Sequence, residues 1–296
     1  MDVSIIIVNY NTKDLLKQCI ESVFAETRDI EYEIIIVDNA SSDGSQQIIK
    51  DAFPTVTLVE SPENLGFGRA NNLGFEYAKG RHLFLLNSDT VLLNNAVKIL
   101  SDYLDNNPEV GVCGGNLYAE KGVPTLSFRR RISSIFTELD AFFRGKLSRM
   151  LYKENIEFNH TGKPLKVGYI TGADMMLRAS VFDAVGKFDP DFFMYSEDVE
   201  LTYRIRKSGL FVFSIPDAQI IHLTGRSSQI DAKKIKVMMN SSNLYLEKTQ
   251  GRFQGKIVRM LIYLNIYSNI FLYKLRKNDN KLNYWKLTLQ YFQLSR

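Results

Sequence analysis

Residues 3–11 read VSIIIVNYN, an apolar run that ends in polar side chains. The same form returns at residues 33–39, EIIIVDN, and at residues 82–89, HLFLLNSD. Neighbouring side chains of a strand point to opposite faces, so a run that is apolar at successive positions is typical of a strand buried on both faces. The three runs therefore predict a sheet that is covered by helices on two sides.

Helical spacing and strand-like runs alternate along the first part of the chain. Amphipathic patterns predict helices over residues 13–24, 46–53, 68–78 and 94–105, and short apolar runs predict further strands over residues 56–61 and 110–114. The first helix is expected to be capped near Asn11 or Thr12. This alternation favours an α/β fold with a doubly wound, mostly parallel sheet, whose ligand crevice lies beyond the carboxyl ends of its strands.

Polar residues stand at three of the predicted strand ends. They are Asn9-Tyr10-Asn11, Asp38-Asn39 and Asn87-Ser88-Asp89. One such end on its own is equally well explained as an ordinary loop start. Three ends at one edge of a parallel sheet predict a shared binding crevice.

The pattern is irregular from Leu117 to Lys166, a segment that contains the consecutive arginines Arg129 to Arg131. We interpret this segment as loops and short helices. Regular patterns then return and predict the following elements: a strand pair or strand-turn over 167–177, helices from 180 and over 199–207, and strands over 211–214 and 218–222.

The net charge of +4 is unevenly distributed over the 296 residues. Residues 232–296 carry a balance of +11, which leaves −7 for residues 1–231. Within this basic tail, residues 260–273 form an apolar, tyrosine-rich run between Arg259 and Lys274, too short and too polar to span a bilayer. We expect an interfacial helix on an anionic membrane surface, or a helix that docks on the protein's own core or on a second subunit.

Cys19 and Cys113 lie in a predicted helix and a predicted strand, which suits buried thiols better than a disulfide. The chain begins with Met1-Asp2 and a strand-like run, without the basic n-region and the small-residue cleavage site of a signal peptide. We therefore expect a cytoplasmic protein, peripheral on the inner face of the cell membrane through its tail, with no nucleic acid partner.

Acidic residues supply two candidate sites. Asp89 follows a predicted strand and offers the hard oxygen ligand that Mg²⁺ or Mn²⁺ prefers, although helix capping would explain it about as well. Glu197 and Asp198 precede a predicted helix, where they either complement the helix dipole or supply a general base. The aromatic residues from Phe188 to Tyr195 would raise the pKa of such a base by burying it.

A third candidate site is the segment His222 to Ser228, HLTGRSS. A single histidine is more often a structural residue than a ligand, but Arg226 and the hydroxyls beside Gly225 suit a phosphate. The chain has three histidines, so a zinc site built from several of them is not expected.

These motifs, in this order, resemble family-2 glycosyltransferases with the GT-A fold, and among them the rhamnosyltransferase-like branch. The resemblance covers residues 3–230 and rests on these segments: Ser4 to Asn11, Val37 to Gly44, Asn64 to Asn72, Asn87 to Asp89, Gly172-Ala173, Glu197-Asp198 and His222 to Ser227. It implies a catalytic domain over residues 1–230, with a nucleotide-binding part over about 1–116 and an acceptor part over about 117–230. The helices expected over 231–296 would contact a membrane surface or form a homodimer.

The resemblance also implies a site for a nucleotide diphosphate sugar. Asp38 would bind the N3–H of a uracil or thymine ring, while Val8, Asn9 and Tyr10 would line the nucleoside. The residues implied around the ribose, the diphosphate and the metal are Asn64, Gly66, Arg69, Asn87, Ser88, Asp89, His222 and Arg226.

The metal and the base follow from the same resemblance. Asn87 stands where many relatives have the first aspartate of an Asp-x-Asp motif, which should loosen the binding of Mg²⁺ or Mn²⁺ at Asp89. His222 would compensate as a ligand, or would only contact the diphosphate. Asp198 is implied as the base that deprotonates the acceptor, with Glu197 as the fallback, in a reaction that inverts the anomeric centre.

The implied function is the transfer of L-rhamnose from dTDP-L-rhamnose to a polyprenyl-diphosphate-linked glycan or a cell-surface polysaccharide. The chain lacks a Gln-x-x-Arg-Trp motif, which argues against a processive synthase. The alternatives are a UDP-hexose-dependent enzyme of the same family, a sugar-phosphate nucleotidyltransferase and an inactive binding scaffold. Asn9 to Thr12 is not the glycine-rich basic loop of a nucleotidyltransferase, and the presence of Asp38, Asp89 and Asp198 argues against a scaffold.

Overall fold

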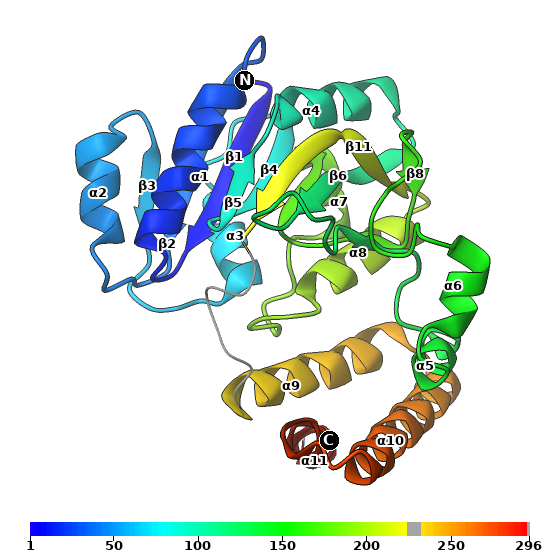
Figure 1. Ribbon diagram of the computed structural model, residues 1–296. Helices are drawn as coiled ribbons and strands as arrows, with labels where there is room; N and C mark the ends of the chain where they lie inside the picture. The colour runs from blue at the N-terminus through cyan, green and yellow to red at the C-terminus, as the bar shows by residue number, and fades with distance from the viewer. Residues whose placement is uncertain (224–231, 295–296) are drawn as a thin grey trace.

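The computed structural model describes residues 1–223 and 232–294 (Figure 1). Within them the main sheet has nine strands in the order β3-β2-β1-β4-β10-β6-β11-β5, with β8 paired to β11, and β7 pairs with β9 in a small second sheet. The strands are β1 Val3–Asn9, β2 Tyr32–Asp38, β3 Thr57–Glu60, β4 His82–Asn87, β5 Thr90–Leu92, β6 Val110–Tyr118, β7 Phe128–Arg129, β8 Leu165–Lys166, β9 Tyr169–Ile170, β10 Asp174–Arg178 and β11 Phe211–His222. The helices are α1 Lys13–Glu26, α2 Ser45–Ala52, α3 Phe67–Phe75, α4 Ala96–Asn106, α5 Ile135–Phe142, α6 Lys146–Tyr152, α7 Ala179–Val185, α8 Glu197–Lys207, α9 Ala232–Thr249, α10 Arg252–Leu275 and α11 Asp279–Leu294.

The amino-terminal half of the sheet is parallel, as predicted. β3, β2, β1 and β4 run in one direction, and their register places Asn9 beside Asp38 and Val8 beside Asn87. β10 is antiparallel to β4 and β6, whereas β6 and β11 are parallel to each other. The sheet is therefore mixed around a parallel core, which brings the polar strand ends to one edge.

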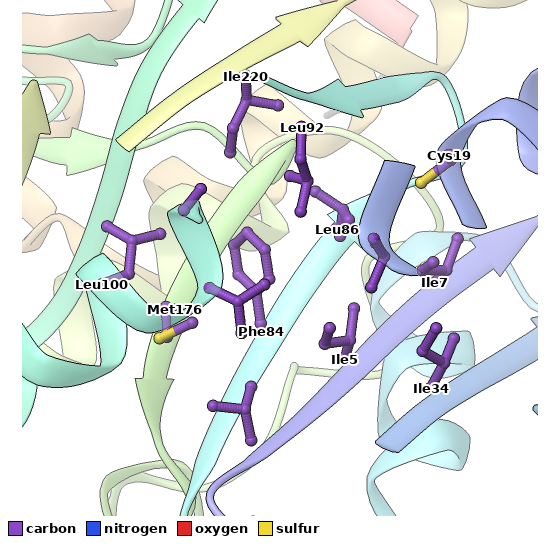
Figure 2. Close-up of a cluster of buried hydrophobic side chains, with 14 of the residues drawn as sticks. Ile5, Ile7, Cys19, Ile34, Phe84, Leu86, Leu92, Leu100, Met176 and Ile220 are labelled. Atoms are coloured by element: carbon purple, nitrogen blue, oxygen red, sulfur yellow. The ribbon is translucent and has the colours of Figure 1, made fainter. Parts of the chain in front are cut away.

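Both faces of β1 are buried, which confirms the interpretation of the apolar runs. Ile5 and Ile7 pack in a cluster with side chains of α1 and α4 (Figure 2), and Ile6 packs on the opposite face with side chains of α3 and α7. Burial of one such side chain contributes about 1.5–3 kcal/mol. α3 approaches β1 so closely that a Cβ atom on Gly74 would lie 2.6 Å from Cγ2 of Ile6, so the helix needs glycine there.

The two strands predicted near the end of the sheet are one strand, β11. Its pairing with β6 changes register between Ser214 and Gln219. Pro216 lies within this irregular stretch, and a proline has no N–H for the ladder. The interruption was visible in the sequence, but the continuation of the same strand beyond it was not.

β5 was not predicted, because it is three residues long and follows β4 directly. It pairs antiparallel with the end of β11 and places Thr90 opposite His222. This pairing carries His222 to the strand end that holds Asp89.

The tail helices pack below the sheet (Figure 1). α10 contacts α5 and α11, and α11 contacts α9. Tyr245 and Leu246 of α9 pack with Phe192 and with Val258 of α10, so part of the tail docks on the protein's own core, which was one of the expected alternatives. Across the described residues, none of the helices is both long enough and apolar enough to cross a bilayer.

Candidate active site

The ends of β1 and β2 are joined by hydrogen bonds at Asp38. The Oδ1 of Asp38 accepts from Nδ2 of Asn9 at 2.8 Å, and its Oδ2 accepts from the backbone N of Ser41 at 3.0 Å and from Nε2 of Gln46 at 2.7 Å. The side chain of Asp38 is fully buried. Asp38 therefore shapes the loop after β2 in this structure, and its direct contact with a base stays a prediction.

The ends of β1 and β4 are joined through Thr12. Thr12 is the N-cap of α1, but its hydroxyl donates to Oδ1 of Asn9 at 2.7 Å and lies 2.8 Å from Oγ of Ser88, and it makes no cap bond to the helix. Tyr10 is half exposed beside this network, and Val8 packs on the second core cluster. The polar residues predicted at the ends of β1 and β4 therefore lie next to each other at one edge of the sheet.

His222 and Asp89 form a close pair at the same edge. Nε2 of His222 lies 3.2 Å from Oδ1 of Asp89 and 3.4 Å from Nδ2 of Asn87. The backbone N of Leu223 donates to the carbonyl O of Asp89 at 2.9 Å, which fixes the end of β11 against the loop after β4. Arg226, predicted at the diphosphate, lies outside the described residues.

This pair offers one carboxylate and one imidazole to a divalent cation. The side chains of Asp89 and His222 are 14% and 13% exposed, so each is partly accessible to solvent. No group of three or more acidic, histidine or cysteine side chains with metal-site geometry occurs within residues 1–223 and 232–294. Two protein ligands fit Mg²⁺ or Mn²⁺ when substrate phosphates and water complete the shell. We call Asn9, Asp38, Asn87, Asp89 and His222 the strand-end site.

The loop before α3 is held by two asparagines. Nδ2 of Asn39 donates to Oδ1 of Asn64 and to the carbonyl O of Gly66, each at 3.0 Å. Gly66 has a φ of 80°, and a Cβ atom there would lie 1.9 Å from the carbonyl O of Phe193. Nε of Arg69 donates to the backbone of the same loop, at the carbonyl O of residue 65, so Arg69 supports the loop. Its contact with a phosphate stays a prediction.

Asp198 lies at the start of α8 and faces the loop before β10. Its Oδ2 accepts from the backbone N of Gly172 at 3.0 Å, and its Oδ1 accepts from the backbone N of Val199 at 2.8 Å. A Cβ atom on Gly172 would lie 3.1 Å from the ring of Phe67, so Asp198 also borders the start of α3. The backbone N of Asn87 donates to the carbonyl O of Ala173 at 3.0 Å, which connects Asp198 to the strand-end site through residues 172–173.

The pKa values of Asp198 and its neighbour Glu197 are both raised. Burial is the main cause for each, and the charge of Asp198 further raises the pKa of Glu197. Glu197 is 4% exposed, and its Oε2 has no hydrogen-bond partner among the described residues. Two N–H donors favour the charged form of Asp198, whereas Glu197 has no such donor on Oε2, so Asp198 carries the charge more readily.

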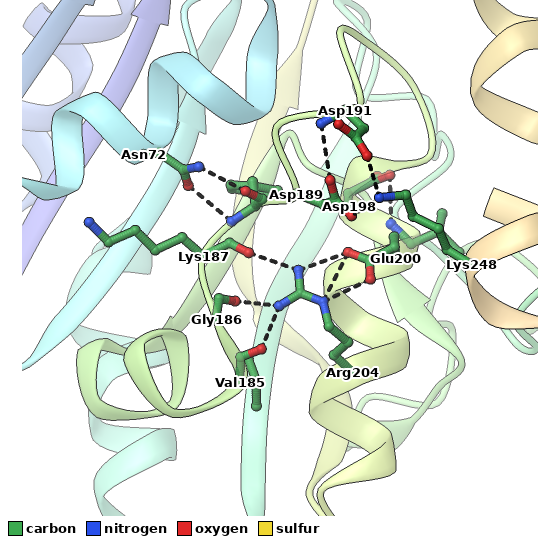
Figure 3. A network of polar contacts seen from close by, with 12 residues as sticks. Asn72, Val185, Gly186, Lys187, Asp189, Asp191, Asp198, Glu200, Arg204 and Lys248 are labelled. Carbon is green, nitrogen blue, oxygen red and sulfur yellow. Dashed lines mark hydrogen bonds and ion pairs between the residues drawn. The ribbon is translucent and has the colours of Figure 1, made fainter. Parts of the chain in front are cut away.

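The segment over residues 186–196, which we call the base loop, leads into Asp198 (Figure 3). Arg204 of α8 donates to the three backbone carbonyls of residues 185–187 and to the carboxylate of Glu200. Asn72 of α3 exchanges two hydrogen bonds with the backbone of Phe188, at 2.8 and 2.9 Å. Sequence reasoning missed these residues, although the i, i+4 spacing of Glu200 and Arg204 was a usable signal.

The base loop is also tied to the tail. Nζ of Lys248, in α9, lies 2.6 Å from Oδ2 of Asp189 and 2.6 Å from Oδ2 of Asp191. Oγ of Ser241, also in α9, donates to the carbonyl O of Met194 at 2.7 Å. The base loop therefore bridges the strand-end half of the molecule and the tail helices.

The family model for glycosyl transferase family 2 matches residues 4–186 of the chain. The chain belongs to glycosyl transferase family 2. It is similar to the N-acetylglucosaminyl-diphospho-decaprenol L-rhamnosyltransferase of Mycobacterium tuberculosis, with 28% identity over 67% of this chain and 68% of the relative. It is also similar to the dTDP-rhamnosyl transferase RfbF of Shigella flexneri, with 25% identity over 75% of this chain and 69% of the relative. These relatives place the glycosyltransferase in the rhamnosyltransferase-like branch.

A solved structure supports the fold of this glycosyltransferase. The mannosyltransferase PcManGT from Pyrobaculum calidifontis, solved with GDP-Man and Mn²⁺, superposes with a TM-score of 0.60 at 15% identity, over 99% of this chain and 85% of that chain. The chain therefore has the predicted GT-A fold with a carboxyl-terminal helical extension.

Two neighbouring cavities in this glycosyltransferase lie between the irregular segment and the tail. Their volumes are about 540 and 630 Å³, and both are lined by Arg130, Arg131, Tyr152 and Tyr245. The first also reaches Ser196, at the end of the base loop. The three arginines noted in the sequence thus line a space next to Asp198.

Proposed function

We propose that this glycosyltransferase moves L-rhamnose from dTDP-L-rhamnose to a glycan that is linked through a diphosphate to a polyprenol. One observation carries the proposal. Asp89 and His222 lie on one side of residues 172–173, and Asp198 lies on the other side. One side suits a diphosphate, and the other suits an acceptor hydroxyl. The names of the relatives from Mycobacterium tuberculosis and Shigella flexneri support the choice of sugar, nucleotide and acceptor.

We place the diphosphate of the donor at the strand-end site. Asp89 would hold Mg²⁺ or Mn²⁺ there through its hard carboxylate oxygen, and His222 would add an imidazole ligand, which suits Mn²⁺ better than Mg²⁺. When bound, the ion stabilises the negative charge that grows on the leaving diphosphate. Asn87 faces His222 as a neutral amide, so Asp89 is the one carboxylate among these three side chains.

Asp198 acts as the general base in this proposal. The acceptor oxygen attacks the anomeric carbon, the bond from that carbon to the diphosphate breaks, and the proton of the acceptor hydroxyl passes to the Asp198 carboxylate. One such displacement inverts the anomeric centre. Glu197 stays protonated beside Asp198, because burial and the charge of Asp198 raise its pKa.

We propose that the tail helices hold the enzyme on the inner face of the cell membrane. α10 presents one stripe of large apolar side chains, each at least 48% exposed: Phe253, Met260, Leu264, Tyr267, Phe271 and Leu275. The 3- and 4-residue spacings of this stripe from residue 260 onward keep it on one helix face. Apolar side chains beside lysines and arginines favour an anionic lipid surface. A homodimer through this stripe is the competing arrangement, which the oligomeric state in solution without lipid would reveal.

A UDP-hexose donor is the main alternative within the family. The test is a panel of dTDP- and UDP-sugars, assayed for transfer with added Mg²⁺ or Mn²⁺ and a polyprenyl-diphosphate-linked acceptor. We expect turnover with dTDP-L-rhamnose, and activity with UDP-hexoses alone would contradict the rhamnose assignment. Release of pyrophosphate from a nucleoside triphosphate would instead indicate a nucleotidyltransferase, and binding without turnover of any donor would indicate a scaffold.

A further inference from the structure

The cavity of about 540 Å³ is strongly basic. Its lining includes Arg129, Arg130, Arg131 and Arg144. Nη1 of Arg130 is buried and has no hydrogen-bond partner in the described part of the chain. The guanidinium of Arg130 lies 4.7 Å from the ring centroid of Tyr152, which fixes its plane at the cavity wall. A buried guanidinium nitrogen without a partner is costly, so an anionic ligand that supplies the missing acceptor would be stabilised here.

This basic cavity begins next to the proposed base. Ser196 and Val199 line it and flank Asp198 along the chain, and Tyr169 lines it as well. Burial raises the pKa of Tyr169 to about 12, the charge of Asp198 adds to this rise, and a hydrogen bond with Arg129 opposes it. Tyr169 stands opposite Arg129 in the pairing of β7 with β9, and both line the cavity together with Ser196 and Val199. An acceptor sugar that reaches Asp198 would direct its anomeric substituent into the basic cavity.

Two acidic side chains line the same cavity and weaken its positive charge. Burial raises the pKa of Glu138 to about 7, so this group is partly protonated near neutral pH. Oδ1 of Asp140, in α5, accepts a hydrogen bond from the backbone N of Ser148, in the first turn of α6, at 3.0 Å. Arg129 forms an ion pair with Glu157. Arg130, Arg131 and Arg144 have no such ion pair in the described residues, and of these three Arg130 has the buried nitrogen without a partner, so it is the arginine most available to a ligand.

An apolar rim adjoins the cavity at the turn between α5 and α6. Phe142 and Phe143 are 39% and 49% exposed, and Met150 and Leu151 are 74% and 52% exposed. Residues 144–145 of the same turn line the cavity. α10 packs against α5, so the exposed stripe of α10 belongs to the same corner of the molecule (Figure 1). An exposed apolar surface beside a basic cavity matches a ligand with an anionic head and a hydrocarbon chain.

We infer that the basic cavity binds the diphosphate of the lipid-linked acceptor, with Arg130 as its main ligand and the isoprenoid chain on the rim between α5 and α6. The inference deepens the proposed function and rests on it for the identity of the acceptor. It adds a specificity site: the enzyme selects acceptors by the charge between sugar and lipid. An uncharged glycoside would lack this contact.

The test measures binding, so it does not depend on sugar transfer. Farnesyl diphosphate and farnesol are titrated calorimetrically into the full chain, with the strand-end site saturated by Mg²⁺ and by dTDP or UDP, whichever binds more tightly. We expect farnesyl diphosphate to bind at least about 10-fold more tightly than farnesol, because hydrogen bonds between charged groups are strong. In Arg130→Gln this preference falls by about 10-fold.

Arg28→Gln is the matched control, because Arg28 is an exposed arginine that does not line the cavity, and it should keep the full preference. Arg131→Gln is a second variant. The side chain of Arg131 is exposed, so the substitution should not impair folding. This variant should lose part of the preference for farnesyl diphosphate over farnesol. Equal binding of farnesyl diphosphate and farnesol by the wild-type chain would overturn the inference. The same holds if the arginine variants keep the wild-type preference. A chain that passes this test but transfers no sugar would refute the proposed function alone.

Discussion

Replacement of Asp198 with asparagine keeps the volume of the side chain and removes its capacity to accept a proton. The carboxylate accepts from the backbone N of Gly172 at 3.0 Å and from that of Val199 at 2.8 Å. Asparagine can keep its carbonyl oxygen on Val199, but its amide nitrogen then faces the N–H of Gly172. The variant therefore loses the base and one hydrogen bond.

Loss of the hydrogen bond should have a small effect on stability, whereas loss of the base should have a large effect on the rate, so the variant separates the two roles. One hydrogen bond to a charged group contributes about 1.5–3 kcal/mol, and loss of the charge beside buried Glu197 offsets part of it. We expect the unfolding free energy to fall by at most about 2 kcal/mol, which lowers the melting temperature by roughly 4–8 °C. A general base contributes about 100- to 10,000-fold to the rate, so kcat should fall by about 100-fold or more in a folded enzyme.

The assay follows release of the nucleoside diphosphate together with product formation, and calorimetry measures nucleotide affinity for the same samples. Nucleotide affinity should stay within about 2-fold, because a base acts on the transition state and not on the donor. Transfer by the wild-type enzyme should fall as the pH is lowered, because burial raises the pKa of Asp198 and the protonated acid cannot accept a proton. Glu197→Gln is the matched control and should keep at least about a tenth of the wild-type kcat.

Three outcomes would contradict this assignment. Asp198→Asn with more than about a tenth of the wild-type kcat would show that Asp198 is not the base. A large loss in Glu197→Gln with little loss in Asp198→Asn would move the base to Glu197. A parallel loss of nucleotide affinity and melting temperature would mean that Asp198 acts on the fold.

Other parts of the structure give three further predictions. Asp174 is fully buried and its pKa is raised well above 3.8 by burial, so the folded chain binds more protons than the unfolded chain above that pH, and stability falls as the pH rises. Asp174→Asn removes this dependence, by up to about 1.4 kcal/mol per pH unit, and urea denaturation should show a larger gain at pH 8 than at pH 5; equal effects at both would contradict the burial argument. His222→Gln should raise the Mn²⁺ concentration for half-maximal transfer by about 10-fold or more, because one of two protein ligands is lost, while exposed His160→Gln should not; an unchanged requirement would exclude His222 as a ligand. The double variant Leu264→Ser, Phe271→Ser should weaken sedimentation with anionic liposomes by at least about 10-fold through lost apolar contact, with exposed Val123→Ser as the control, and unaltered, salt-insensitive binding would favour a dimer through α10.

The sequence predicted well where the polar residues of the strand-end site lie in the fold, because that signal is local. Buried parallel strands need apolar runs, and the polar residue that ends each run is visible in the sequence. Asn9, Asp38 and Asn87 were therefore located correctly at neighbouring strand ends. His222 was expected near Asp89 from the resemblance, and the structure brings the two to 3.2 Å through the pairing of β5 with β11.

The sequence could not show which polar side chains already form hydrogen bonds with other groups of the protein. Asp38 and Arg69 are chemically suited to a ligand, yet Asp38 holds three protein donors and Arg69 binds a backbone carbonyl. The role of Arg204 at the base loop also depends on contacts up to nineteen residues away. These assignments depend on tertiary geometry, which residue type and local spacing do not encode.

In the proposed function, Lys248 and Ser241 make the tail part of the catalytic machinery as well as a membrane anchor. They attach α9 to the base loop, whose other side is clamped by Asn72. A shortened chain that ends near residue 230 should therefore still capture the nucleotide but hold its proton acceptor poorly. Weak turnover by such a fragment would reflect a loosened base loop and would not contradict the assignment of the donor. A bilayer that binds the tail would also hold the proposed catalytic residue at a fixed height above the lipid.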